Sequence, residues 1–311
     1  MTGFKLVHHY SLVTSTTFKN GSPSSQFASQ FVVPAFGFKE PALMHALLAL
    51  SAIHLHKLYD PLGIADQDYF SLGQEHKSKA LALDTSPAPS DIHSLTRIFL
   101  AVYNMAESFA VLGPPGLFTL MDTVRDTLRG EDYFRFFQDE QLWPLDWPFN
   151  CQGVRIVPTE VEEQLLSISY MADTSHLFPP LLKRIHLPDT AWPDSDELVL
   201  DPAISAVYKA SVDALRASWY LCHLCPGNGL ALASATSWVV RMTDEFRHLL
   251  VVERRPRALV ILYYYCLMLS HLDPQQCWWA GKHAECMAWI RTMLSANWVE
   301  GVMAAMPGVE R

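Results

Sequence analysis

The segment Ala42-Leu-Met-His-Ala-Leu-Leu-Ala-Leu-Ser-Ala-Ile-His-Leu-His-Lys-Leu58 decides the fold class of this chain. It is apolar on almost every face, and its length favours a helix over a strand. Because a helix that is apolar all round is buried by its neighbours, we expect this helix to lie at the centre of the molecule.

Further helical patterns lie on both sides of this segment, and prolines and glycines separate them. No convincing alternating strand pattern appears, so we predict an all-α fold, a single large helical bundle domain of about ten helices over residues 1–311. The proline-rich stretch 174–202 is predicted to be a long connector. The other helices are predicted at 5–18, 67–83, 91–112, 117–129, 158–172, 203–225, 230–252, 258–272 and 282–295.

Composition and charge exclude several classes of protein. Half of the 311 residues are hydrophobic and 18% are charged, which indicates a large core rather than disorder. The net charge of −9 argues against direct binding of nucleic acid by this chain. The most apolar run, 258–269, is too short for the roughly twenty residues that span a bilayer, so we expect no membrane span.

The cysteines and the N-terminus indicate where the protein is found. The six cysteines are scattered through apolar surroundings, which is typical of a reduced protein inside the cell. The first ten residues lack the long uncharged apolar core of a secretory signal. We therefore expect an intracellular protein of the cytoplasm and nucleus.

No sequence motif for catalysis or metal binding is found. Cys222-His-Leu-Cys225 has no second pair that would complete a zinc site, so we expect no metal. The nucleophile elbow, the phosphate-binding loop and the glycine-rich dinucleotide turn are all absent, so we expect no cofactor. We find no acid and base pair with a catalytic arrangement, and we name no catalytic residue.

The last third of the chain is rich in aromatic residues and methionine. Flat and polarisable side chains suit a large, rigid, apolar ligand, although core packing is the better explanation for any single one of them. Only the cluster as a whole indicates a pocket. Its members are Tyr263-Tyr-Tyr265, Met268, Trp278-Trp279, Met287, Trp289, Met293 and Trp298.

Several stretches near the two ends of the chain are informative when they are taken together. They are Lys5-Leu-Val-His-His-Tyr10, 43–55, 69–80, Glu245-Phe246, 255–262, Leu267-Met-Leu269, Trp278-Trp279, Trp298 and Met306-Pro307. In order and spacing they resemble the regulatory domain of fungal transcription factors of the sterol uptake control family. The resemblance covers the opening helices and the final helices, and the middle of the chain is matched mainly by its order.

The resemblance implies an all-α bundle whose apolar pocket accepts a sterol or a related lipid. In that family the domain follows a zinc binuclear cluster that binds DNA. No Cys-x2-Cys-x6-Cys run precedes Lys5, so we expect this chain to correspond to the sensor half. By matching position and chemistry, we expect the ligand near Tyr264, Cys266, Met268, Trp278, Gly281 and Met287. Gly281 matches a turn where a side chain would intrude on the pocket.

Two classes of function remain open at this stage. The first is a ligand-responsive regulatory domain that binds a sterol or terpenoid and changes the exposure of a partner surface. Its macromolecular partner is expected to be a second copy of the chain or a transcriptional partner protein. The second is a stand-alone terpenoid- or polyketide-binding protein, or a cyclase of secondary metabolism, that reuses this fold.

Overall fold

The computed structural model confirms the all-α class. It describes residues 2–18, 28–84, 91–128, 182, 185–186, 197–198, 201–224, 231–272 and 277–304. Within these ranges the regular elements are α-helices, with short 3-10 and π-helical turns, and no strand occurs. The predicted helix 158–172 and most of the predicted connector 174–202 lie outside these ranges.

The described residues divide into two compact units. The first unit takes in residues up to 128 together with 277–282. The second unit takes in 182–224, 232–272 and 283–304. The expectation of one regulatory domain over 1–311 stays a prediction.

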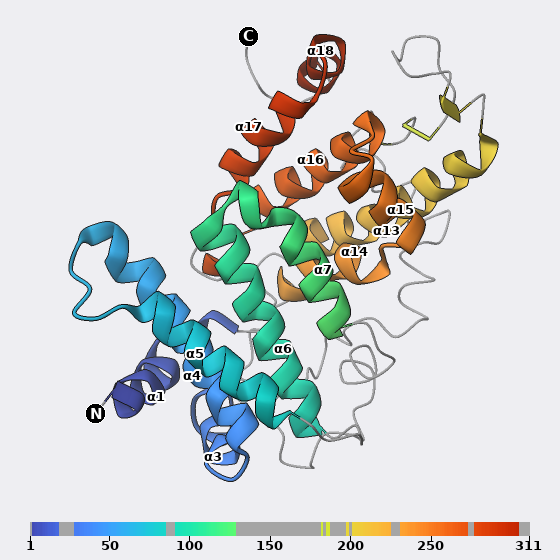
Figure 1. The fold of residues 1–311 in the computed structure, drawn as a ribbon. Coiled ribbons are helices and arrows are strands. Elements are labelled where there is room, and N and C mark those ends of the chain that lie inside the picture. Colours follow the sequence, from blue (N-terminus) through green and yellow to red (C-terminus); the bar gives the residue numbers. More distant parts are fainter. Residues whose placement is uncertain are drawn as a thin grey trace. The chain divides into compact units, whose positions relative to one another are not determined.

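The first unit is built around the helix that the sequence places at the centre. Figure 1 shows α4 (Pro41–Tyr59) with α1, α3, α5 and α6 packed beside it. Pro41 occupies the first helical position, where its missing N–H costs nothing, and every residue from 46 to 55 is buried. The other elements are α1 (Thr2–Leu12), η1 (Thr14–Phe18), η2 (Ala28–Val32), α3 (Val33–Gly37), η3 (Asp60–Leu62), α5 (Tyr69–Leu83), α6 (Asp91–Met105), η4 (Ala106–Leu112), η5 (Pro114–Gly116), α7 (Leu117–Leu128) and η7 (Trp278–Ala280).

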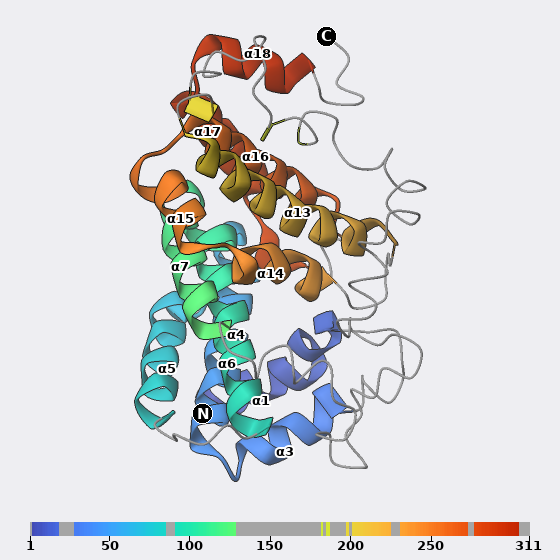
Figure 2. The ribbon, with the colours of Figure 1, turned by 90° about the vertical axis from the view of Figure 1, so that its right-hand side faces the viewer.

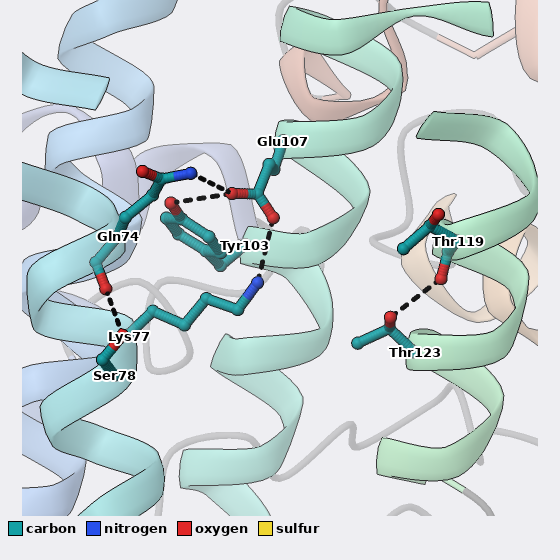
Figure 3. A network of polar contacts seen from close by, with 7 residues as sticks. All are labelled: Gln74, Lys77, Ser78, Tyr103, Glu107, Thr119 and Thr123. Carbon is teal, nitrogen blue, oxygen red and sulfur yellow. Dashed lines mark hydrogen bonds and ion pairs between the residues drawn. The ribbon is translucent and has the colours of Figure 1, made fainter. Parts of the chain in front are cut away.

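A polar network joins α5 to α6 and to η4, which follows α6 (Figure 3). Lys77 Nζ donates to Glu107 Oε2 at 2.9 Å, and the two side chains are only 23% and 14% exposed. Gln74 Nε2 and the Tyr103 hydroxyl each donate to the other carboxylate oxygen at 3.4 Å. Because the partly buried carboxylate accepts three hydrogen bonds, this network holds two helices together rather than presenting a reactive group.

The second unit is a separate group of helices. Figure 2 shows α13 (Pro202–Leu224) running beside α16 (Pro256–Ser270), and α17 (His283–Met293) also packs on α16. The Arg257 guanidinium is wholly buried, donates to the Ile185 carbonyl and lies over the Trp298 ring at 5.7 Å. The remaining elements are α14 (Ala231–Arg241), α15 (Asp244–Arg247), η6 (His248–Val252) and α18 (Ala296–Ala304).

Two predicted helices are wrong as continuous elements. The expected helix 5–18 is interrupted at Val13, between α1 and the 3-10 turn η1. The expected helix 230–252 is broken at Met242 and Thr243 into α14, α15 and η6. The Thr243 side chain accepts a hydrogen bond from the Phe246 N–H at 3.2 Å and caps a new helix, which explains the break. The described residues also contain helical elements that are not among the predicted ones, namely η2, α3, η3, η5, η7 and α18.

Candidate ligand-binding site

Helix α16 carries three of the six predicted ligand residues. It begins at Pro256, after Arg255 in an extended conformation, and buries twelve of its fifteen residues. Three consecutive tyrosines, Tyr263 to Tyr265, point in different directions because each helical residue turns the chain by about 100°. The surroundings of each phenol therefore differ.

Tyr265 is fixed by the neighbouring helices α14 and α13. Its hydroxyl donates to the Ala235 carbonyl at 2.7 Å, and its ring centroid lies 4.6 Å from that of Trp238. Trp238 Nε1 in turn donates to the Ser211 carbonyl and hydroxyl oxygens at 3.2 and 3.1 Å. These bonds satisfy the polar atoms of both rings, so Tyr265 stabilises the core of this unit.

Tyr264 is different, because its hydroxyl has no hydrogen-bond partner among the described residues. The side chain is 0% exposed, and its ring meets that of Tyr263 edge-on at 5.8 Å. Burial raises the pKa of Tyr264, so the phenol is neutral and able to donate. A buried hydroxyl without a partner is costly, and a ligand oxygen would remove that cost.

Three further predicted residues lie in the same unit. Cys266 and Met268 on α16 are wholly buried, and the Met268 carbonyl faces the Cys222 thiol at 3.8 Å. Burial, and then the nearby Cys286 on α17, raise the pKa of Cys266, so its thiol is neutral. Met287, also on α17, is half-buried. The structure thus groups four predicted residues on two packed helices.

Trp278 and Gly281 belong to the first unit. The Trp278 ring stacks on His54 of α4, with centroids 4.1 Å apart and planes 10° apart, and its Nε1 donates to Thr17 Oγ1 at 3.1 Å. Gly281 has φ −66° and ψ 171°, a conformation open to any residue. The next residue, Lys282, has φ 59°, and its ammonium donates to the Val111 carbonyl at 2.9 Å.

The histidine cluster beside Trp278 was not anticipated from the sequence. Thr14 Oγ1 and His54 Nδ1 are joined by a hydrogen bond of 2.9 Å, and His9 meets His54 edge-on at 5.1 Å. Burial lowers the pKa of His54 to about 3 and that of His9 to about 4, so both rings are neutral. His54 and Trp278 lie far apart in the sequence, and no local pattern links them.

Among the described residues, no group of three or more histidine, cysteine, aspartate or glutamate side chains is arranged to hold a metal ion. Cys225 of the Cys-x-x-Cys pair lies outside the described ranges. None of the described helices combines the length and apolarity needed to cross a membrane.

Comparison with known proteins gives a family match at the beginning of the chain. Residues 5–110 match the family model of the fungal specific transcription factor domain. The match covers about a third of the chain and lies within the first unit, so the six predicted ligand residues fall outside it. No curated protein and no solved structure matches the chain.

The resemblance to fungal transcription-factor regulatory domains is therefore confirmed at the level of this domain, over residues 5–110. The narrower assignment to the sterol uptake control proteins stays a prediction.

Proposed function

We propose that this chain is a ligand-responsive regulatory domain of a fungal transcription regulator, and that it binds a sterol or a similar apolar lipid against α16. The match of residues 5–110 to the fungal specific transcription factor domain carries the regulatory part of the proposal. Such a role also calls for a nuclear location at some stage and for a partner, either a second copy or a transcriptional protein.

The unpartnered hydroxyl of Tyr264 supports the ligand part of the proposal. A neutral phenol inside an apolar helix surface favours a ligand that is mostly hydrocarbon and carries one hydroxyl or carbonyl oxygen. Cys266 and Met268, on the same helix, add soft apolar surface. A ligand shifts a regulatory equilibrium only when it binds one conformation more tightly than the other.

Native mass spectrometry of the purified chain with a panel of sterols and other terpenoids tests this proposal. We expect saturable 1:1 binding of an unaltered lipid that carries a hydroxyl or carbonyl group. Absence of saturable binding across the panel would contradict the ligand part. Extraction of each mixture separates the two classes, because a chemically converted terpenoid or polyketide would make the chain an enzyme.

Tyr264→Phe and Tyr265→Phe form a matched pair for locating the ligand. Each change removes one hydroxyl, but only Tyr265 has a described partner for it. Loss of a ligand hydrogen bond at Tyr264 should weaken binding by about tenfold, or about 1.4 kcal/mol. Binding that is equally affected by both changes would place the ligand oxygen elsewhere.

A further inference from the structure

The chain between α16 and α17 contains a short segment that belongs to the other unit. Helix α16 ends at Ser270 and α17 begins at His283, and both helices lie in the second unit. The described residues 277–282 between them belong to the first unit. This docked segment, 277–282, therefore connects the first unit through the chain to the two helices that carry four of the predicted ligand residues.

Trp278 anchors the docked segment inside the first unit. Its ring stacks on His54 of α4 with 4.1 Å between the centroids, and its Nε1 donates to Thr17 Oγ1 at 3.1 Å. Trp278 is 6% exposed, and the side chains of Cys277 and Trp279 beside it are 3% and 1% exposed. Connecting segments usually run over the surface, whereas this one buries three consecutive side chains.

Lys282 anchors the other end of the docked segment. Its ammonium donates to the Val111 carbonyl of η4 at 2.9 Å, and η7 packs against η4 and α6. The partners of Trp278, Thr17 and His54, lie within residues 5–110, which match the fungal specific transcription factor domain. The regulatory domain thus holds the segment that joins the two ligand helices.

The docked arrangement carries two identifiable costs. Lys282 has φ 59°, a left-handed conformation that is unfavourable for a residue with a side chain. His9, which meets His54 edge-on, has a buried Nε2 with no hydrogen-bond partner among the described residues. Such features persist only when the surrounding contacts outweigh them, and they are typical of elements that change conformation. They lower the free energy that holds the segment in place, so a small change at either end can release it.

We propose that the docked segment is the regulatory connection between the two units. A ligand that changes α16 and α17 acts on 277–282 through the chain, and release of Trp278 then alters the first unit around α4 and η1. Thermodynamic linkage requires the reverse effect, so a change that loosens the segment in the first unit must also loosen α16 and α17. The regulatory meaning of this connection rests on the proposed function, whereas the reverse effect needs no ligand.

Thr17→Val and Thr16→Val form a matched pair for testing the connection. Each threonine donates to a carbonyl three residues earlier at 2.7 Å, but only Thr17 also accepts the hydrogen bond from Trp278. Both changes lie in η1 and leave every residue of the second unit as it is. Amide hydrogen exchange of the full chain without ligand, resolved to peptides of 277–282, α16 and α17, measures the response.

We expect Thr17→Val to raise the opening equilibrium of 277–282 and of the adjoining ends of α16 and α17 about fivefold relative to Thr16→Val. This is the effect of one lost hydrogen bond. Lys282→Met, which removes the donor at the other end of the segment, should act in the same direction. Peptides of α5 should exchange equally in all three variants, which shows that the first unit keeps its fold.

Unchanged exchange of α16 and α17 in Thr17→Val would overturn the proposal, even if 277–282 exchanged faster, because the segment would then open without affecting the helices. Equal effects of Thr17→Val and Thr16→Val would overturn it as well. Lipid binding is measured separately. Coupled exchange without lipid binding would contradict only the proposed function, and lipid binding without coupled exchange would contradict only this inference.

Discussion

The clearest prediction concerns the two neighbouring tyrosines of α16, because the same substitution should destabilise the protein at one of them and not at the other. Tyr265→Phe removes the 2.7 Å bond to the Ala235 carbonyl inside the core. Such a bond contributes about 1 kcal/mol net. Tyr264→Phe removes a hydroxyl that has no described partner, so it should be neutral or should stabilise the second unit by about 1 kcal/mol.

Amide hydrogen exchange resolved to peptides of α14 and α16 measures this difference within one unit. A loss of about 1 kcal/mol in Tyr265→Phe should raise the opening equilibrium of α14 and α16 about fivefold. Tyr264→Phe should leave exchange in the same peptides unchanged or slower. The two rings keep their size in both variants, so the comparison isolates the hydroxyl groups.

An equal loss of protection in both variants would refute the reasoning. It would mean that the Tyr264 hydroxyl already has a hydrogen-bond partner in the folded protein, such as an ordered water. The hydroxyl would then not be available to a ligand in the way that the proposed function requires.

Other predictions concern the first unit. Trp278→Ala should destabilise the first unit by about 3–5 kcal/mol in urea denaturation, because it removes the stack on His54 and leaves a cavity. Since burial lowers the folded pKa of His54 to about 3, the unfolded state binds more protons below about pH 6.5, and the contribution of His54 to stability should fall by about 2 kcal/mol between pH 7 and pH 5, in addition to a similar fall from His9. His54→Gln should flatten that part of the profile, and an unchanged slope would contradict the burial of the ring. Glu107→Leu should cost about 2–3 kcal/mol in thermal unfolding, because Lys77 loses its partly buried partner, and Glu107→Gln should cost less.

The positions of most helices in the described ranges could be predicted from the sequence because they depend on local periodicity. The apolar segment 42–58 indicates a central helix, and α4 spans Pro41–Tyr59. Similar patterns predict α5, α13 and α16 to within a few residues. The break inside 230–252 was missed because a threonine cap is a weak local signal within a long apolar pattern.

The candidate site could be predicted only in part. Sequence clustering indicates the aromatic end of the chain, and three of the six residues lie on one buried helix. It does not distinguish Tyr264 from Tyr265, because only the neighbouring helices decide which hydroxyl meets a carbonyl. It also does not show that Trp278 stacks on His54 in the first unit.

The sequence alone therefore determined the helical class and the order of most described helices, because hydrophobic periodicity and helix-breaking residues act over a few turns. The tertiary structure decided which distant side chains meet. His45 and His76, or His54 and Trp278, come together only when helices pack against one another. That packing depends on the shapes of whole helix surfaces, and no local sequence pattern encodes it.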